Sequence, residues 1–200
     1  RSVCMGSNHT CILLVDGTVW CCGENTDGRC GLEASEDDCK LRQVELGQKA
    51  VAIGCGEQFT VVVGAADTFS FGVNDNGQLG RGGEPFELSP LALPRAQSVC
   101  CGLSHTVVQT ERGVYGFGSN KQLQLGQPDD VSAVKDPQVL YEHCEVGNLG
   151  ACCNLSWAAL TEGMPDFAQG VLVMPRRANA LAIRAPHRLL TIDSDLEPAW

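Results

Sequence analysis

The chain has 200 residues, which is enough for one domain with its own core or for part of a larger ring of repeats. Its formal net charge of −10 repels phosphate backbones and anionic membranes, so we expect no nucleic acid and no membrane as partner and favour a basic protein face. No stretch approaches the roughly 18 apolar residues that a membrane-spanning helix needs, and no signal peptide opens the chain.

A five-residue motif recurs three times. It reads Gly6-Ser-Asn-His-Thr10, then Gly56-Glu-Gln-Phe-Thr60, then Gly102-Leu-Ser-His-Thr106. The spacing from His9 to Phe59 to His105 is 50 and 46 residues. A period of this length is typical of propeller blades and is too long for most helical-hairpin repeats. The sequence therefore predicts an all-β chain built of repeated units.

Two apolar, β-rich stretches follow each motif, and each pair predicts a hairpin. The pairs are 11–15 with 18–22, 61–63 with 68–71, and 107–110 with 114–117. Asp16 and Gly17 lie between the first pair, and this dipeptide favours a two-residue type I′ turn.

A glycine-bounded loop follows each hairpin, at 23–31, 72–80 and 118–126. Glycine and asparagine recur there because the backbone must turn left-handed or pass close to a neighbour. The residues that we expect to be structural in the repeat are Gly6, His9, Trp20, Gly23, Gly28, Gly31, Gly56, Gly72, Gly77, Gly80, Gly102, His105, Gly118 and Gly126.

Three clear repeats are expected at about 3–50, 51–98 and 99–150, so that residues 1–150 form the well-marked part of the propeller. Residues 151–200 are interpreted as one or two degenerate repeats that continue it. Within them, 152–160 reads as a repeat start and strand, 164–177 carries two prolines and no hairpin with a glycine loop, and 178–183 is a candidate first strand of a fifth repeat before a divergent insert at 184–195.

The combined pattern resembles the repeat of the regulator of chromosome condensation family. It runs from Gly-x-x-His-Thr through two strands joined by Asp-Gly to Asn-x-x-Gly-Gln-Leu-Gly, and it is most complete at 9–31 and 72–80. Phe59 and Leu123 depart from it. The resemblance implies a β-propeller of seven four-stranded blades, of which this chain supplies a partial ring with open edges. Because the chain begins at Arg1, we expect a fragment.

The histidines and cysteines are interpreted as structural. His9 and His105 recur at one repeat position, whereas a catalytic base is needed once, so we expect them to bridge adjacent strands. The chain has 12 cysteines but no Cys-x-x-Cys pair, and the doublets at 21–22, 100–101 and 152–153 predict buried free thiols in a reducing compartment. We expect no catalytic residue, no cofactor and no metal site.

One loop resembles a calcium-binding loop at first sight. Asn74, Asn76 and Gly77 fall at positions three, five and six of an EF-hand loop, but Gly72 and Gly83 stand where its charged ligands belong. A turn is therefore predicted.

An acidic connector joins the first two repeats and is the candidate partner-binding segment. Its acidic residues are Glu33, Glu36, Asp37 and Asp38. On a propeller such a loop projects from one rim, where binding usually resides, although a solvated charged loop is the alternative.

Two functions remain open. The first is a non-catalytic scaffold for protein–protein interaction, in the cytoplasm or the nucleus. The alternative, which only the resemblance implies, is guanine-nucleotide exchange on a small Ran-like GTPase; no insertion here matches the wedge that carries this activity in the family.

Overall fold

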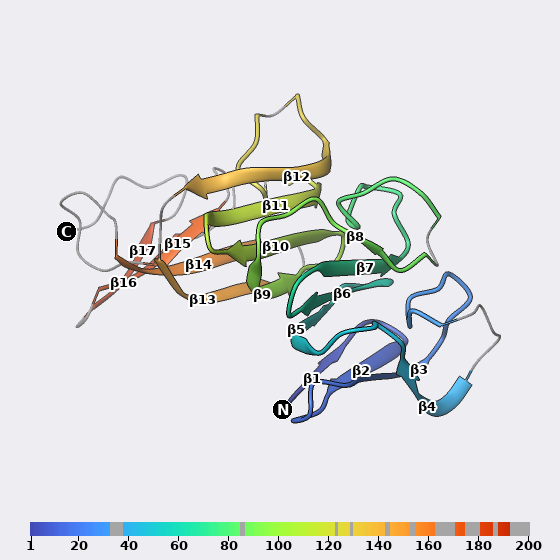
Figure 1. The fold of residues 1–200 in the computed structure, drawn as a ribbon. Coiled ribbons are helices and arrows are strands. Elements are labelled where there is room, and N and C mark those ends of the chain that lie inside the picture. Colours follow the sequence, from blue (N-terminus) through green and yellow to red (C-terminus); the bar gives the residue numbers. More distant parts are fainter. Residues whose placement is uncertain are drawn as a thin grey trace.

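The structure is a computed structural model. It describes residues 1–32, 38–84, 87–122, 124–128, 130–142, 145–152, 155–162, 171–174, 181–185 and 188–192, with side chains at 1–32, 40–140 and 151 within this set. All elements in this part of the chain are β-strands, which confirms the expected fold class (Figure 1). None of the described residues forms a helix that could cross a membrane.

Three four-stranded antiparallel sheets follow one another along the chain, and we call them blades 1 to 3. Blade 1 contains β1 (Ser2–Met5), β2 (His9–Leu13), β3 (Val19–Gly23) and β4 (Asp38–Val44). Blade 2 contains β5 (Ala50–Cys55), β6 (Phe59–Gly64), β7 (Thr68–Gly72) and β8 (Ser89–Pro90). Blade 3 contains β9 (Ala96–Cys101), β10 (His105–Thr110), β11 (Gly113–Ser119) and β12 (Ala133–Glu142).

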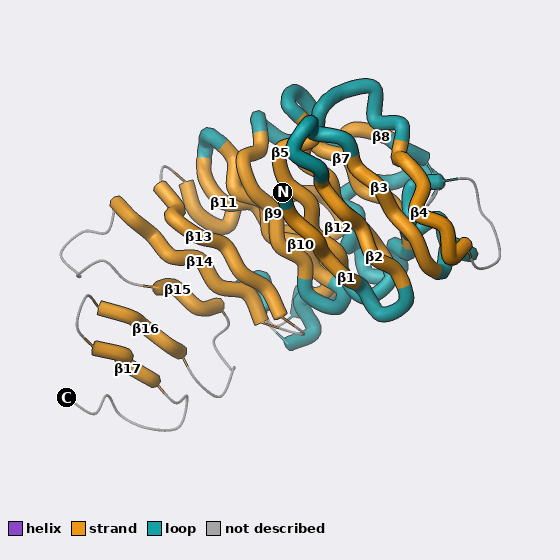
Figure 2. The backbone as a smooth tube through the Cα atoms, turned by 90° about the horizontal axis from the view of Figure 1, so that it is seen from below, coloured by secondary structure: helices purple, strands orange, loops and turns teal. Residues whose placement is uncertain are grey.

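The blades form an open arc in chain order (Figure 2). Within each blade the strands pair in sequence order as a meander. The first strands β1, β5 and β9 contact one another in turn, so they line the same side of the arc. This arrangement is a partial propeller.

Two smaller sheets continue the arc. β13 (Glu145–Cys152), β14 (Leu155–Glu162) and β15 (Val171–Met174) form one, and β16 (Leu181–Ala185) and β17 (Arg188–Ile192) form the other.

The sequence left two of these strands unassigned. β15 lies inside the segment 164–177, where no hairpin was expected, and it pairs with β14. β17 lies inside the supposed insert 184–195 and pairs with β16. Both lack the glycine loop that marked the earlier repeats, so the motif gave no signal for them.

The first hairpin turn differs from the expected type I′ turn. The Gly17 amide donates to the Leu14 carbonyl, and the Leu14 amide donates to the Thr18 carbonyl. The connection therefore spans Val15, Asp16 and Gly17, with Gly17 at a φ of 87°. This is the three-residue hairpin in which a left-handed glycine follows a tight turn. The prediction of a two-residue turn was wrong by one residue.

Burial shows which blades are covered on both faces. Every residue of β6 and β7 is buried, whereas β2 and β3 alternate between buried and half-buried positions. A strand packed on both faces is buried at every position, and one packed on a single face is buried at every second position. Blade 2 therefore lies between two blades, whereas among the described residues blade 1 packs against blade 2 alone.

The apolar core lies at the seams between blades. One buried cluster joins blades 1 and 2 and includes Leu13, Val44 and Phe71; another joins blades 2 and 3 and includes Val63, Val107 and Phe117. Each seam thus holds two blades together by shared burial.

Each seam also needs a glycine beneath an aromatic ring. A Cβ on Gly31 would lie 2.8 Å from Cζ of Phe71, and one on Gly80 would lie 2.8 Å from Cδ2 of Phe117. Both glycines also have positive φ values, 66° and 63°. The last glycine of the first two loops therefore serves both the turn and the packing of the next blade.

We expect Gly31→Ala to destabilise the protein by about 2–4 kcal/mol, because it adds an overpacking cost to a left-handed backbone cost of about 1–2 kcal/mol. Gly47→Ala is the control, since Gly47 has a φ of 69° and nothing within 4 Å of the added carbon. Urea denaturation of both variants measures the difference. Equal losses would show that the ring contact contributes nothing.

Candidate functional site

The loops at one end of the blades form a continuous rim. In each blade the third strand ends beside the motif loop. In blade 1 the Glu24 amide donates to the Asn8 carbonyl at 2.8 Å, and in blade 3 the Ser119 amide donates to the Ser104 carbonyl at 2.7 Å. Between blades, the Glu57 amide donates to the Leu103 carbonyl at 3.1 Å. We call the motif loops and the glycine-bounded loops together the loop rim.

The candidate acidic connector leaves this rim between β3 and β4. Glu33, Glu36 and Asp37 lie outside the described residues. Asp38 begins β4, where its backbone pairs opposite Gly23. The connector is therefore anchored at both ends to the loop rim of blade 1, and its role in binding stays a prediction.

An asparagine side chain holds each glycine-bounded loop in shape. Oδ1 of Asn25 accepts the Cys30 amide at 2.9 Å, and Oδ1 of Asn74 accepts the Leu79 amide at 3.0 Å. Asn120 makes the same bond to the Leu125 amide at 3.2 Å. Because the Asn74 oxygen serves the backbone, the structure supports the turn interpretation of this loop.

Threonine hydroxyls join each blade to the blade before it. Oγ1 of Thr60 donates to the carbonyl oxygen of Arg29 at 2.8 Å, and Oγ1 of Thr106 donates to that of Gln78 at 3.0 Å. Both threonines are fully buried. The threonine that ends the motif thus connects the loops of two neighbouring blades at each of these seams.

His9 meets the same hydroxyl across the seam. Its Nε2 lies 2.8 Å from Oγ1 of Thr60. The single proton of that hydroxyl goes to the Arg29 carbonyl, which can only accept, so His9 must donate from Nε2. His9 therefore bridges two blades, whereas the sequence predicted a bridge between adjacent strands.

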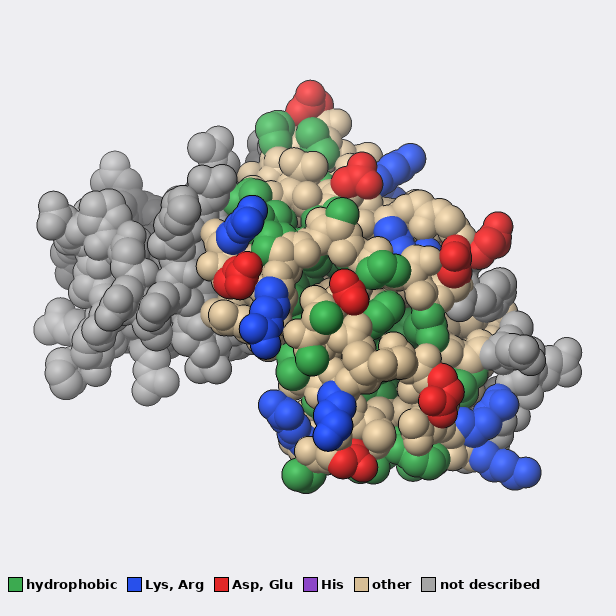
Figure 3. Space-filling model, viewed as in Figure 1, with side chains coloured by type: hydrophobic (Ala, Val, Ile, Leu, Met, Phe, Trp, Pro, Cys, Tyr) green, Lys and Arg blue, Asp and Glu red, His purple; other side chains and the backbone are tan. Residues whose placement is uncertain are grey.

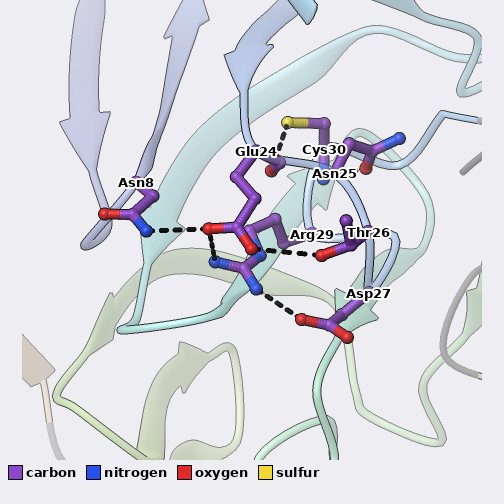
Figure 4. Close-up of polar contacts among 7 residues, drawn as sticks. All are labelled: Asn8, Glu24, Asn25, Thr26, Asp27, Arg29 and Cys30. Carbon is purple, nitrogen blue, oxygen red and sulfur yellow. Dashed lines mark hydrogen bonds and ion pairs between the residues drawn. The ribbon is translucent and has the colours of Figure 1, made fainter. Parts of the chain in front are cut away.

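A buried arginine organises the loop rim of blade 1 (Figure 4). Arg29 is only 1% exposed, and its Nη1 lies 3.2 Å from Oε2 of Glu24 while Nη2 pairs with Asp27. Glu24 also accepts hydrogen bonds from Asn8 at 2.7 Å and from Thr26 at 3.1 Å. These bonds, with that from Asn8 the largest influence, lower the pKa of the Glu24 carboxyl.

The sequence reasoning missed both Arg29 and Thr60. A signal existed for each: threonine recurs in all three motifs, and Arg29 stands where the later loops have Gln78 and Gln124. Both glutamines are buried and accept a backbone amide of their own loop, from Asn76 and Gln122 respectively. The departure from glutamine marks blade 1 as the blade whose loop carries an ion-pair network.

Two cysteines correct the prediction of free thiols. Cys11 and Cys21 form a disulfide between β2 and β3, where they stand directly opposite each other. Directly opposite positions in an antiparallel pair bring side chains close enough to bond, and a spacing of ten residues across a hairpin gives no motif that sequence inspection recognises.

Two of the free thiols, Cys30 and Cys100, have the low reactivity of structural cysteines. Burial raises the pKa of the Cys30 thiol to about 11 and that of Cys100 to about 12, so both are poor nucleophiles at neutral pH.

Among the described side chains, one group has donor atoms close enough for a metal ion. These atoms, from His9, Cys11 and Cys55, lie within 4.8 Å of one another. Since Cys11 is bonded to Cys21, it offers no thiolate, and two remaining donors are too few for a tetrahedral site. The residues as arranged do not fit a metal ion.

The surface around these loops mixes both signs of charge. Figure 3 shows acidic and basic side chains interspersed on the described face. The excess acid of the chain is therefore not gathered on this face.

The comparisons with known proteins agree with this geometry. Family models described as the regulator of chromosome condensation (RCC1) repeat match residues 1–29, 16–63 and 67–109. These matches cover more than half of the chain. The chain belongs to the RCC1 repeat family.

RCC1-repeat relatives share part of their length with this chain. The RCC2 homolog of Danio rerio is 37% identical over 79 residues, covering 38% of this chain and 16% of the relative. An RCC1 repeat-containing protein of Schizosaccharomyces pombe is 32% identical over 92 residues, covering 41% and 26%. The probable E3 ubiquitin-protein ligase HERC4 of Homo sapiens is 32% identical over 95 residues, covering 46% and 9%.

Solved structures show the same RCC1-type fold. Human WBSCR16 has a TM-score of 0.73 at 15% identity, covering 88% of this chain and 48% of the other. Prp20p from Saccharomyces cerevisiae has a TM-score of 0.71 at 20% identity, covering 86% and 44%. The chain thus spans less than half the length of each of these three relatives and two structures.

We expect Thr60→Val to destabilise the protein by about 2–4 kcal/mol, because it removes the hydroxyl partner of both Nε2 of His9 and the buried Arg29 carbonyl. Thr10→Val is the control, since Thr10 holds the same motif position in blade 1, which follows no other blade among the described residues. Chemical denaturation compares them. Equal, small losses would mean that the seam bond adds no net stability.

Acid should weaken the Arg29 network. Because Glu24 has a lowered pKa in the folded protein, its contribution is present above its unfolded pKa and is lost as pH falls through the folded value. Below about pH 5, the free energy of unfolding should therefore fall more steeply in the wild type than in Glu24→Gln. Glu45→Gln serves as a control for charge alone, and identical slopes in all three proteins would contradict the prediction.

Proposed function

We propose that this chain is part of a protein-interaction scaffold that binds its partner through the loop rim and the acidic connector. The observation that carries the proposal is the way each rim loop is held. An asparagine fixes the shape of each loop, and a threonine hydroxyl from the next blade fixes the position of two of them. A rim whose loops are held in this way offers a defined surface at low cost in conformational entropy.

The chemistry favours a basic partner. With a formal net charge of −10, the chain attracts positively charged protein surfaces, and the connector concentrates four acids within six residues, 33–38. The structural likeness to Prp20p supports a protein partner, because the structural report on Prp20p addresses its binding to Gsp1p and histones. We place the protein in the cytoplasm or nucleus as part of this proposal.

The second candidate is guanine-nucleotide exchange on a small GTPase. The likeness to Prp20p, which binds Gsp1p, supports it. Such activity would act through binding contacts rather than bond-making chemistry, so a non-catalytic loop rim is compatible with it.

The test uses two variants that each remove three negative charges. Glu33→Gln, Glu36→Gln and Asp37→Asn remove three of the four negative charges of the connector, while Glu45→Gln, Asp67→Asn and Glu111→Gln remove three at the opposite end of the blades. Proteins captured from cell extract by the wild-type chain should fall at least tenfold with the connector variant, because steering and contact are both lost, and should persist with the control. Quantitative mass spectrometry measures the capture.

In a parallel experiment, the rate of nucleotide release from a panel of small GTPases is measured with and without the wild-type chain. Accelerated release would favour the second candidate. Capture that is equal in both charge variants would exclude the connector as the binding segment.

A further inference from the structure

Four cysteines form a row across the seam between blades 1 and 2. Cys21, Cys11 and Cys4 stand at directly opposite positions on β3, β2 and β1. Cys55 on β5 extends the row into blade 2, where it stands opposite Thr60. The first two cysteines are already joined as a disulfide, and the second two are free.

The two free thiols, Cys4 and Cys55, lie close enough together to form a disulfide after a small movement. Sγ of Cys4 and Sγ of Cys55 lie 2.7 Å apart, which is only about 0.7 Å more than the disulfide length of about 2.05 Å. Both side chains are half-buried, so a small oxidant can reach them. The two residues lie on neighbouring first strands, β1 and β5, which contact each other.

The next seam provides a comparison within the same chain. Cys4 lies two residues before its motif glycine, and Gly54 holds this position in blade 2; Cys55 and Cys101 both lie one residue before theirs. A Cβ on Gly54 would lie 3.0 Å from Sγ of Cys101. The contact therefore recurs at the second seam, but there glycine stands at the position that Cys4 holds at the first seam.

We propose that Cys4 and Cys55 form a reversible disulfide that locks blade 1 to blade 2 under oxidising conditions.

The electrostatics of the pair suit this chemistry. The hydrogen bond from the Cys4 thiol lowers the pKa of the Cys55 thiol, and His9 lowers it further, so Cys55 is the nucleophile. The same bond and burial raise the pKa of Cys4, which keeps its proton until Cys55 has reacted.

With hydrogen peroxide as oxidant the steps balance. The Cys55 thiolate attacks one peroxide oxygen, the O–O bond breaks, and the departing hydroxide takes up a proton as water, leaving a sulfenic acid. The Cys4 sulfur then attacks the Cys55 sulfur, the S–O bond breaks, and the hydroxide leaves with the Cys4 proton as a second water. Overall, two thiols and one peroxide give one disulfide and two waters. A thiol reductant reverses the bond by exchange.

Tryptic digestion of the full chain gives a direct readout. Cys55 is the single cysteine of the peptide 50–81, and Cys4 lies in the peptide 2–29 together with Cys11, Cys21 and Cys22. After peroxide treatment and alkylation of remaining thiols, we expect a cross-linked species of these two peptides that disappears with dithiothreitol. The cross-link should raise the Tm by about 10 °C, because it closes a long loop in the unfolded chain.

Two variants decide the assignment. Cys4→Ser should abolish the cross-link, and Cys101→Ser, which removes the equivalent thiol at the second seam, should leave it unchanged. Circular dichroism checks that both variants fold. A cross-link that persists in Cys4→Ser would assign the bond to another cysteine and overturn the proposal. So would oxidation of wild-type Cys55 to sulfinic acid with no cross-linked peptide.

Discussion

A single hydrogen bond, donated by a buried threonine hydroxyl, sets how blades 2 and 3 each meet the blade before them. Thr60 and Thr106 are fully buried, and each donates to a loop carbonyl of the preceding blade. A buried acceptor that loses its donor costs about 1–3 kcal/mol, so the loop must present that carbonyl at one place. The left-handed glycines, the asparagine braces and the ring that packs on Gly31 all serve this placement. Each of these contacts limits the conformations that the loop rim can take.

Much of this could be predicted from recurrence. A hairpin and a glycine loop at a fixed distance from each motif predicted blades 1 to 3, because a backbone with positive φ admits little besides glycine. Recurrence also argued that His9 was structural. It could not show that the His9 bond crosses a seam, since a repeat describes one blade and the seam belongs to two.

The repeat pattern failed to predict the features at which one blade differs from the others. Arg29 breaks the glutamine pattern and substitutes ion pairs with Glu24 and Asp27, so inspection for repeats passed over it. Cys11 and Cys21 bond across a hairpin whose register no spacing rule reveals. The strands β15 and β17 carry no glycine loop, and β-strands without such punctuation are hard to separate from connecting segments. The acidic connector, although evident in the sequence, lies outside the described residues except for Asp38.

The seam bond also has a polarity along the chain. Thr60 donates back to blade 1 and Thr106 back to blade 2, so in both threonine bonds the donor comes later in the sequence than its acceptor. During synthesis on the ribosome, each new blade therefore meets a carbonyl that is already in place. Assembly by successive docking in one direction follows from this order, and a half-built arc always presents an unsatisfied acceptor at its growing end.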